Sequence, residues 1–343
     1  MELDEVLTAY DMPARNSSSQ LLSSGLINST WKISCGDKAF IVQRINTGVF
    51  QHPEWIAENL ELLGGYLSKF PGYLFVGPIK NANGKTLTTA RDGSVFRIFP
   101  FIKNSYTIDK VSSPEEAFEA ARQFGKFTSV LTDFNANRLK ITLPDFHNLS
   151  LRYRQFIAAV ENGNRERILK SRTQIASLKK EVAIVEEFER IRQNANFKIR
   201  VTHHDTKISN VLFDGKGKGL CVIDLDTVMP GYFISDVGDM MRTYLSPTTE
   251  EETDFSKISI RNDVYRAIVE GYLSEMNQVL TPEEKQKFMY AGKFMIYMQA
   301  LRFLTDYLNN DVYYGARYPD HNLNRAGNQI TLLSRINEVQ DGN

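Results

Sequence analysis

The stretch that most constrains this chain is residues 201–230, which read VTHHDTKISNVLFDGKGKGLCVIDLDTVMP. Two short apolar runs, 211–213 and 220–223, are joined by a connector rich in glycine, which predicts a β-hairpin. A hairpin returns the chain to the end where it began. We therefore expect Asp205 and Asn210, before the first strand, to lie near Asp224, which follows the second.

These residue types in this order are typical of phosphoryl transfer. An aspartate in an H-x-D-x-x-x-x-N loop accepts the proton of the acceptor hydroxyl, and the asparagine five positions later holds a metal ion. This pattern assigns the base to Asp205 and the metal ligands to Asn210 and Asp224, with Asp226 as a second acidic contact. Mg²⁺ suits such a set, because it binds one or two carboxylates together with phosphate oxygens and water. The alternative is a surface hairpin with a capping aspartate.

The loop and the following IDLD resemble the aminoglycoside phosphotransferase and choline kinase superfamily, small-molecule kinases with a protein-kinase-like fold. The family loop usually has glycine where this chain has His204. The later segment 235–239 resembles the family's D-[LV]-[AG] segment, which opens a helix behind the catalytic loop. The resemblance implies an α/β (α+β) fold in two lobes, with ATP and Mg²⁺ as cofactors. It places the nucleotide-binding lobe, a small antiparallel sheet with one helix, at residues 1–102. The larger, mainly helical lobe at 103–343 would carry the catalytic hairpin and bind the acceptor.

Composition narrows the class of protein. The 343 residues carry 41 basic and 41 acidic side chains, so the basic excess of a nucleic-acid-binding protein is lacking. No apolar run approaches the roughly 18 residues of a membrane span, and the N-terminus does not read as a signal peptide. The two cysteines, Cys35 and Cys221, have apolar neighbours and are expected to be reduced. We expect a cytoplasmic protein whose partners are a nucleotide and a small molecule; the oligomeric state stays open.

In the first lobe, a turn around Gly25 stands where a kinase has its glycine-rich loop. Gly25 permits a close backbone approach to phosphate, and Asn28, Ser29 and Thr30 add donors. Taken alone, such a stretch is more often a plain hairpin turn, and its place upstream of the catalytic loop is what favours phosphate binding.

The next strand, 38–46, would carry the cation that binds phosphate. Arg44 is the candidate, although Gln43 occupies that position if the register shifts by one, and a solvent-facing arginine is the alternative. Glu58, on a helix over 53–68, would pair with this cation unless it is simply solvated. Strands near 73–76, 85–90 and 95–99 follow, and Phe101 would lie at the hinge, where backbone groups would bind adenine.

The second lobe is predicted to contain helices from 114, over 150–193, near 236–245, 261–276 and 282–308. His147, in the polar stretch 143–148 between the first two of these helical regions, is a weak candidate for contacting the acceptor. After the last helix comes a polar aromatic stretch, 309–325, that combines rings with hydrogen-bonding groups as a sugar site does.

Three strings, FIVQRINTGVFQHP, FRIFPFIKNSYTID and HHDTKISNVLF with VIDLDTVMPG, resemble bacterial N-acetylhexosamine 1-kinases. This resemblance implies transfer of the ATP γ-phosphate to the anomeric hydroxyl of N-acetylglucosamine or N-acetylgalactosamine. It places Asp205, Arg302 and Tyr313 against the sugar, with Tyr314 as the register alternative. Arg302 is also four residues from Asp306, so an ion pair within the helix is the competing interpretation.

Two other functions compete with this one. The chain is either a kinase of the same superfamily acting on an aminoglycoside, choline or homoserine, or a nucleotide-binding pseudokinase that serves as a scaffold. An aminoglycoside pocket should be strongly acidic, and choline calls for an aromatic cage. The mixture of Arg302, Arg317 and Arg325 with acids suits a neutral, hydroxyl-rich acceptor better. The residues Asp205, Asn210 and Asp224 argue against a pseudokinase.

Overall fold

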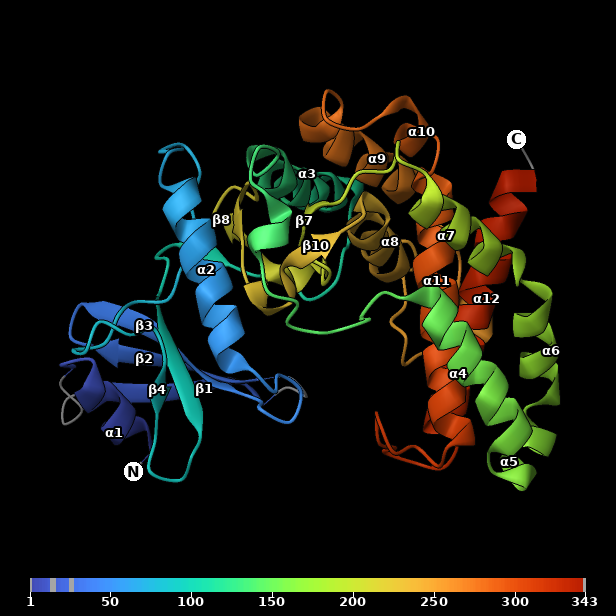
Figure 1. Ribbon diagram of the computed structural model, residues 1–343, viewed down its shortest axis with the longest axis horizontal. Coiled ribbons are helices and arrows are strands. Elements are labelled where there is room, and N and C mark those ends of the chain that lie inside the picture. Colours follow the sequence, from blue (N-terminus) through green and yellow to red (C-terminus); the bar gives the residue numbers. More distant parts are fainter. Residues whose placement is uncertain (1, 13–16, 25–27, 342–343) are drawn as a thin grey trace. The chain divides into compact units, whose positions relative to one another are not determined.

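The computed structural model describes residues 2–12, 17–24 and 28–341, which form two compact units (Figure 1). The first unit holds the described residues up to Tyr106 together with Asp133–Pro144 and Leu212–Pro230. The second holds Thr107–Thr132, Asp145–Val211 and the described residues from Gly231 onward. Two segments far beyond the predicted boundary at residue 102 therefore belong to the first unit. The second of these segments contains most of the hairpin.

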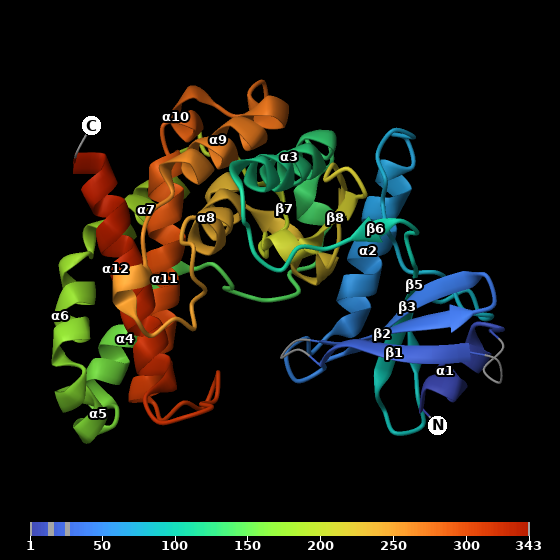
Figure 2. The ribbon, with the colours of Figure 1, turned by 180° about the vertical axis from the view of Figure 1, so that it is seen from behind.

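The first unit is built on an antiparallel sheet whose strand order is β1-β2-β3-β5-β4 (Figure 2). Its strands are β1 Ser17–Ser24, β2 Asn28–Cys35, β3 Lys38–Ile45, β4 Thr88–Thr89 and β5 Val95–Pro100. In the β3–β5 pair, Gln43 lies opposite Arg97 and Arg44 opposite Phe96. Successive side chains of a strand point to opposite faces, so Gln43 and Arg44 belong to different faces of the sheet.

Helix α1 (Glu2–Ala9) covers the face that carries Arg44. Val6 and Leu7, which are spaced to share one side of the helix, are buried against Val42 and Phe96. Helix α2 (Pro53–Leu67) begins with proline at its first turn, as predicted, and buries Ile56, Asn59, Leu60, Leu63 and Leu67.

The strand expected at 73–76 is absent from the structure, which shows irregular chain there. Phe75 lies against α2, where a Cβ on Gly64 would come within 2.9 Å of its ring. Side-chain packing, and not strand pairing, thus fixes this segment. The turn expected at 81–84 is present, because Asn81 Oδ1 accepts hydrogen bonds from the amides of Asn83 and Lys85, both at 3.0 Å.

The hairpin predicted from the sequence consists of β8 (Val211–Asp214) and β9 (Gly219–Val222). Asp214 Oδ1 closes the turn by accepting the amides of Lys216 at 2.8 Å and Lys218 at 2.9 Å. Strand β6 (Ser105–Tyr106) pairs with β8, which explains why the hairpin is grouped with the first unit. Strand β10 (Met229–Gly231) follows the hairpin.

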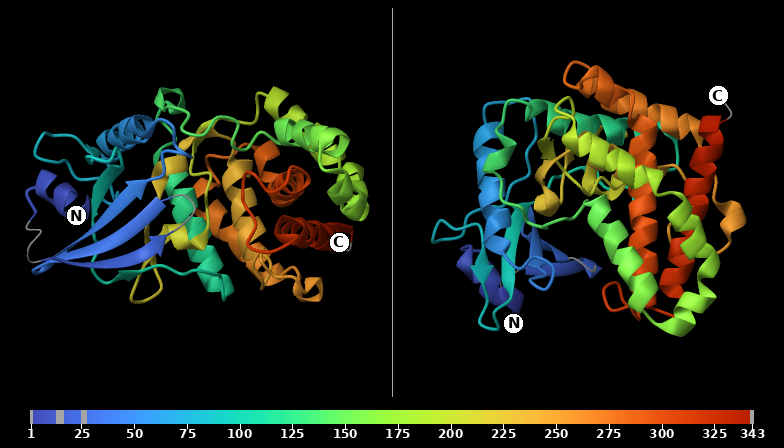
Figure 3. Two further views of the ribbon diagram at one scale, coloured as in Figure 1. Left: turned by 90° about the horizontal axis from the view of Figure 1, so that it is seen from below. Right: turned by 45° about the vertical axis from the view of Figure 1, so that its right-hand side comes forward.

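The second unit is mainly helical, with α11 packed against α4, α7, α8 and α12 (Figure 3). Its elements are α3 Pro114–Val130, α4 Leu149–Asn162, α5 Arg165–Lys170, α6 Arg172–Lys180, α7 Ala183–Gln193, β7 Arg200–Thr202, α8 Phe233–Tyr244, α9 Asn262–Met276, α10 Pro282–Lys285, α11 Phe288–Leu308 and α12 His321–Asp341. Ser113 caps α3 through the amide of Glu116, as the sequence predicts.

Helix α12 was not expected, since its polar first turn resembles the loop before it. Its apolar residues Leu332, Leu333 and Ile336 are nevertheless buried, so packing against α11 stabilises the helix. Across the described part of the chain, no helix has the length and apolar character required to cross a membrane.

Candidate active site

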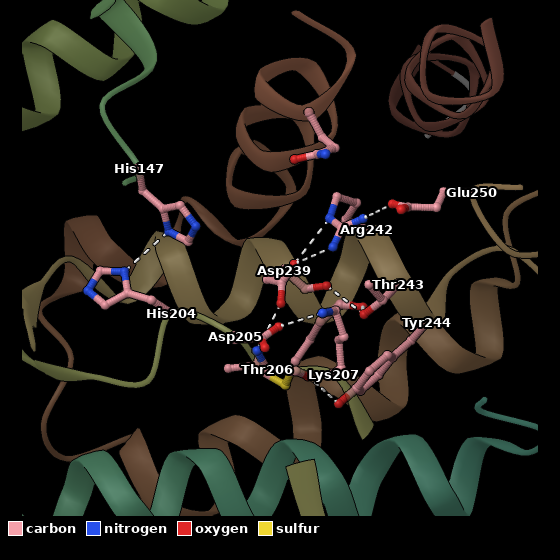
Figure 4. A network of polar contacts seen from close by, with 12 residues as sticks. His147, His204, Asp205, Thr206, Lys207, Asp239, Arg242, Thr243, Tyr244 and Glu250 are labelled. Atoms are coloured by element: carbon pink, nitrogen blue, oxygen red, sulfur yellow. Dashed lines mark hydrogen bonds and ion pairs between the residues drawn. The ribbon is translucent and has the colours of Figure 1, made fainter. Parts of the chain in front are cut away.

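The loop after β7 is held by two aspartates of α8, of which Figure 4 shows Asp239. Asp236 accepts the amides of His203 at 3.0 Å and His204 at 2.7 Å. Asp239 accepts the amide of Thr206 at 2.8 Å. The segment 235–239 thus lies behind the loop, as expected, and fixes its backbone. Burial raises the pKa of Asp236 to about 7, against the lowering effect of the two amides.

The backbone conformation and the contacts of His204 show how this loop accommodates a residue other than glycine. Its backbone is left-handed, with φ of 66°, a region that histidine enters more readily than most residues. Its Nε2 lies 2.7 Å from Thr202 Oγ1 and its Nδ1 lies 3.2 Å from His147 Nδ1. A Cβ on Gly231 would come within 2.5 Å of the ring, so Gly231 makes room for it.

Asp205 has an ionised carboxylate that keeps 16% of its surface exposed. Burial alone would raise its pKa, but the cation of Lys207, followed by His203, outweighs burial and the pKa is lowered. Lys207 Nζ lies 3.1 Å from Asp205 Oδ1. Asn210 Nδ2 donates to Asp205 O at 2.9 Å and to Oδ2 at 3.2 Å. Asp205 and Asn210 therefore meet as the motif spacing predicts.

The same loop is tied to α12 by charged side chains. Arg242 of α8 donates to Asp239 Oδ1 at 2.9 Å and to Glu250 at 2.8 Å. Glu250 also pairs with Arg325, whose guanidinium lies 3.8 Å from the centre of the Phe303 ring. The contact of Arg242 with Asp239 joins residues three apart in one helix, whereas Glu250 and Arg325 are far apart in the chain and no local pattern marks them as partners.

The acceptor residues expected at Arg302, Tyr313 and Tyr314 lie around one pocket of about 600 Å³. The alternative Arg302–Asp306 ion pair is absent, since Asp306 accepts the amides of Tyr313 at 2.7 Å and Tyr314 at 2.9 Å. Arg302 instead lies 5.5–5.8 Å from the ring centres of Phe146, Tyr313 and Tyr314. Phe146 stacks on His147, which reaches His204 beside Asp205.

In the first unit, the sheet face away from α1 carries a buried ion pair that the sequence did not reveal. Arg97 Nη1 lies 2.6 Å from Asp226 Oδ1, and both side chains are at least 97% buried. Gln43 Oε1 accepts from Arg97 at 2.9 Å, and Asn28 Nδ2 donates to Asp226 Oδ2 at 2.9 Å. Thr30 also belongs to this face, through its contact with Gln43.

This arrangement bears on the predictions for Arg44, Asp226 and Glu58. Gln43, and not Arg44, shares the face with Asp226, and the cation there is Arg97. Asp226 Oδ1 faces Arg97 and Oδ2 accepts from Asn28, and its role as a second acidic contact at the metal stays a prediction. Glu58 is half exposed and its partner is Lys140 at 3.9 Å, which leaves the expected pairing with a strand cation unfulfilled.

Helix α2 is instead anchored by the neighbouring Asn59, whose side chain bonds both the amide and the carbonyl of Lys140. Ser29 pairs with Arg44 in the sheet and so faces away from Asn28 and Thr30. Phe101, at the end of β5, has Lys32 Nζ 4.0 Å from its ring centre. Gly25 lies outside the described residues.

Asp224 has a left-handed backbone, with φ of 59°, and leads into the short 3₁₀ turn Leu225–Thr227. Such a conformation is costly for a residue other than glycine and is frequent at functional sites. Among residues 2–12, 17–24 and 28–341, no group of three or more His, Cys, Asp or Glu side chains is arranged to hold a metal ion. Mg²⁺ needs fewer protein ligands, and Asn210 and Asp224 offer the hard oxygen donors that it prefers.

The sequence model of the phosphotransferase enzyme family matches residues 18–259, which is most of the chain. This chain belongs to that family. Three solved structures share its kinase-like fold, in which an antiparallel sheet precedes a mainly helical region. A microcompartment-associated aminopropanol kinase has 15% identity and a TM-score of 0.68, over 99% of this chain and 97% of that one. An amicoumacin kinase in complex with AMP-PNP, Ca²⁺ and Ami has 14% identity and a TM-score of 0.64, over 99% of this chain and 92% of that one. A choline kinase from Cryptosporidium parvum Iowa II has 13% identity and a TM-score of 0.60, over 99% of this chain and 96% of that one.

Proposed function

We propose that this phosphotransferase moves the γ-phosphate of ATP to the anomeric hydroxyl of an N-acetylhexosamine. The observation that carries the proposal is Asp205, an ionised and partly exposed carboxylate whose position is fixed by Lys207 and Asn210. The pocket lined by Arg302, Tyr313 and Tyr314 supports a polar, ring-shaped acceptor. The match of the family model and the AMP-PNP and Ca²⁺ bound by the amicoumacin kinase support ATP and a divalent cation.

In this mechanism Asp205 accepts a hydrogen bond from the acceptor hydroxyl and takes its proton as the new oxygen–phosphorus bond forms. The bond between the γ-phosphorus and the bridging oxygen breaks, and ADP leaves. The lowered pKa of Asp205 keeps the carboxylate ready at neutral pH but makes it a weak base, so positioning supplies much of its effect.

Asn210 and Asp224 are the residues that would hold Mg²⁺. The amide nitrogen of Asn210 is bonded to Asp205, which orients the side chain and leaves its oxygen for the metal. Held by these two residues, Mg²⁺ would neutralise the charge that develops on the phosphates. Among the residues of the first unit, Asn28 and Thr30 are proposed to lie against the nucleotide, and Phe101 to lie at the hinge.

An ATP-consumption assay over N-acetylhexosamines, neutral hexoses, aminoglycosides and choline tests this proposal. We expect N-acetylglucosamine or N-acetylgalactosamine to give the highest kcat/KM, with a sugar 1-phosphate as the product. Turnover only with another hydroxyl acceptor would contradict the substrate while keeping the kinase. Nucleotide binding without turnover of any acceptor would favour a pseudokinase.

A further inference from the structure

The pocket of the second unit contains two arginines, which come from different helices. Arg152 of α4 and Arg302 of α11 both line it, together with Gln155, Thr305, Tyr313 and Tyr314. The lining includes one carboxylate, Asp306, and its two oxygens are bonded to the amides of Tyr313 and Tyr314 and to Asn322. The positive charge that faces the pocket is therefore not balanced by its lining.

Arg152 is anchored by neutral groups. Its Nη1 donates to Gln155 Oε1 at 3.0 Å and its Nη2 to the carbonyl of Asp145 at 2.9 Å. Its Nε is buried and has no hydrogen-bond partner, and the same holds for Thr305 Oγ1 in the same lining. Neither Arg152 nor Arg302 forms an ion pair with any side chain in the described ranges, whose gaps are 13–16 and 25–27.

A buried donor without a partner costs free energy that a suitable ligand recovers. Burial and the cation of Arg302 lower the pKa of Arg152, which shows that the charge there is already unfavourable. An ammonium group brought into this pocket would add a third cation. A carbonyl or carboxylate oxygen would instead accept hydrogen bonds from guanidinium groups.

We propose that Arg152 selects acceptors that present a carbonyl-type oxygen, from an N-acyl group or a carboxylate, and rejects those with a free amine. The proposal rests on the proposed sugar kinase function and adds a specificity residue to the acceptor pocket. The reaction itself is unchanged, because Arg152 acts on binding and takes no proton. Arg302 and Arg152 together then distinguish an N-acylated hexosamine from the same sugar with an ammonium group.

The test compares four acceptors of matched ring size at pH 7: an N-acetylhexosamine, the free hexosamine, the neutral hexose and the hexuronic acid. Wild type, Arg152→Gln and Arg152→Glu are assayed for kcat/KM. Binding is measured by calorimetry without nucleotide, so that affinity is read apart from turnover. Arg154→Gln is the control, because Arg154 is exposed on the same helix.

We expect wild type to prefer the N-acetylhexosamine and the hexuronic acid to the free hexosamine. Arg152→Gln should reduce that preference by about tenfold to a hundredfold, as for a hydrogen bond to a charged group, with the KM for ATP unchanged. Arg152→Glu should favour the free hexosamine further, and Arg154→Gln should behave as wild type.

Equal use of the free and N-acetylated hexosamine by wild type would overturn the proposal, as would an unchanged preference in Arg152→Gln. Absence of binding by all four sugars would also overturn it. Phosphorylation of a sugar without this preference would leave the proposed function intact, so the two failures are distinguishable. Melting temperatures equal to wild type show that the variants fold.

Discussion

His204 occupies a backbone position whose conformation favours glycine. Its φ of 66° is a conformation that glycine adopts freely and alanine at a cost of roughly 1–2 kcal/mol. We therefore expect His204→Gly to unfold with a higher free energy than His204→Ala, by roughly 1 kcal/mol, in urea titrations. At the exposed Gln286, where φ is −79°, the order should reverse. A more stable His204→Ala would contradict the left-handed backbone.

Arg302 tests the acceptor pocket. Its hydrogen bonds are long, 3.4 Å to Gln299 and 3.5 Å to Tyr313, so the structure does not depend strongly on it. Arg302→Ala should raise the KM for the sugar about tenfold or more, with little effect on the KM for ATP. The exposed Arg317 gives a control, Arg317→Ala, in which both constants should stay as in wild type. If the KM for the sugar is unchanged in Arg302→Ala, the arginine does not contact the acceptor.

Single residues were predictable where a motif fixes their spacing. Asp205 and Asn210 meet because five residues separate them within one loop, and this distance is visible in the sequence. Arg97 and Asp226 are more than a hundred positions apart, and no local pattern marks either of them as a buried ion pair. The choice between Gln43 and Arg44 depended on a register shift of one residue, which flips every side chain to the other face.

We expect the free energy of unfolding to depend on pH through Asp236 of helix α8, which holds the catalytic loop. The pKa of Asp236 is about 7 in the folded chain against 3.8 as its ordinary value, so the folded state binds this proton more tightly. The contribution of Asp236 to stability is therefore complete at low pH and is lost as the pH rises through 7. Between pH 5 and 8 the free energy of unfolding of wild type should fall by about 2–3 kcal/mol relative to Asp236→Asn.

Urea unfolding of both proteins at pH 5, 6, 7 and 8 checks this expectation. Asp214→Asn is the control, because backbone amides lower the pKa of Asp214 from 3.8 and it does not titrate in this range. Parallel stability curves for wild type and Asp236→Asn would contradict the raised pKa.

Elements were predictable where the hydrophobic periodicity agrees with the capping and turn residues. Examples are α3, with its cap and proline, and the hairpin, with its glycine-rich turn. The predictions for two elements were wrong, for opposite reasons. Residues 73–76 have the composition of a strand, but Phe75 packs against Gly64 and the segment does not pair. Helix α12 buries mostly polar side chains in its first two turns, among them His321 and Asn322, and the apolar residues Leu332, Leu333 and Ile336 come later.

At the scale of the whole molecule, Asn210 belongs to the second unit and Asp224 to the first. This division was not predictable, because the hairpin joins the first unit through β6. We expect Asn210→Ala and Asp224→Ala each to raise the Mg²⁺ concentration needed for half-maximal rate at least several-fold, or to abolish activity. Lys216→Ala, in the exposed turn of the same hairpin, should titrate as wild type. An unchanged Mg²⁺ dependence in either variant would remove that residue from the proposed metal site.

The central claim is that Asp205 receives the proton of the acceptor hydroxyl, and Asp205→Asn tests it most directly. The substitution keeps the size of the side chain and removes the charge that Lys207 and Asn210 hold in place. Transfer of labelled γ-phosphate from ATP to the sugar should be measured beside nucleotide affinity. The account predicts a loss of at least a hundredfold in kcat, the size typical of general base catalysis, with nucleotide still bound. A rate of transfer equal to that of wild type would contradict it.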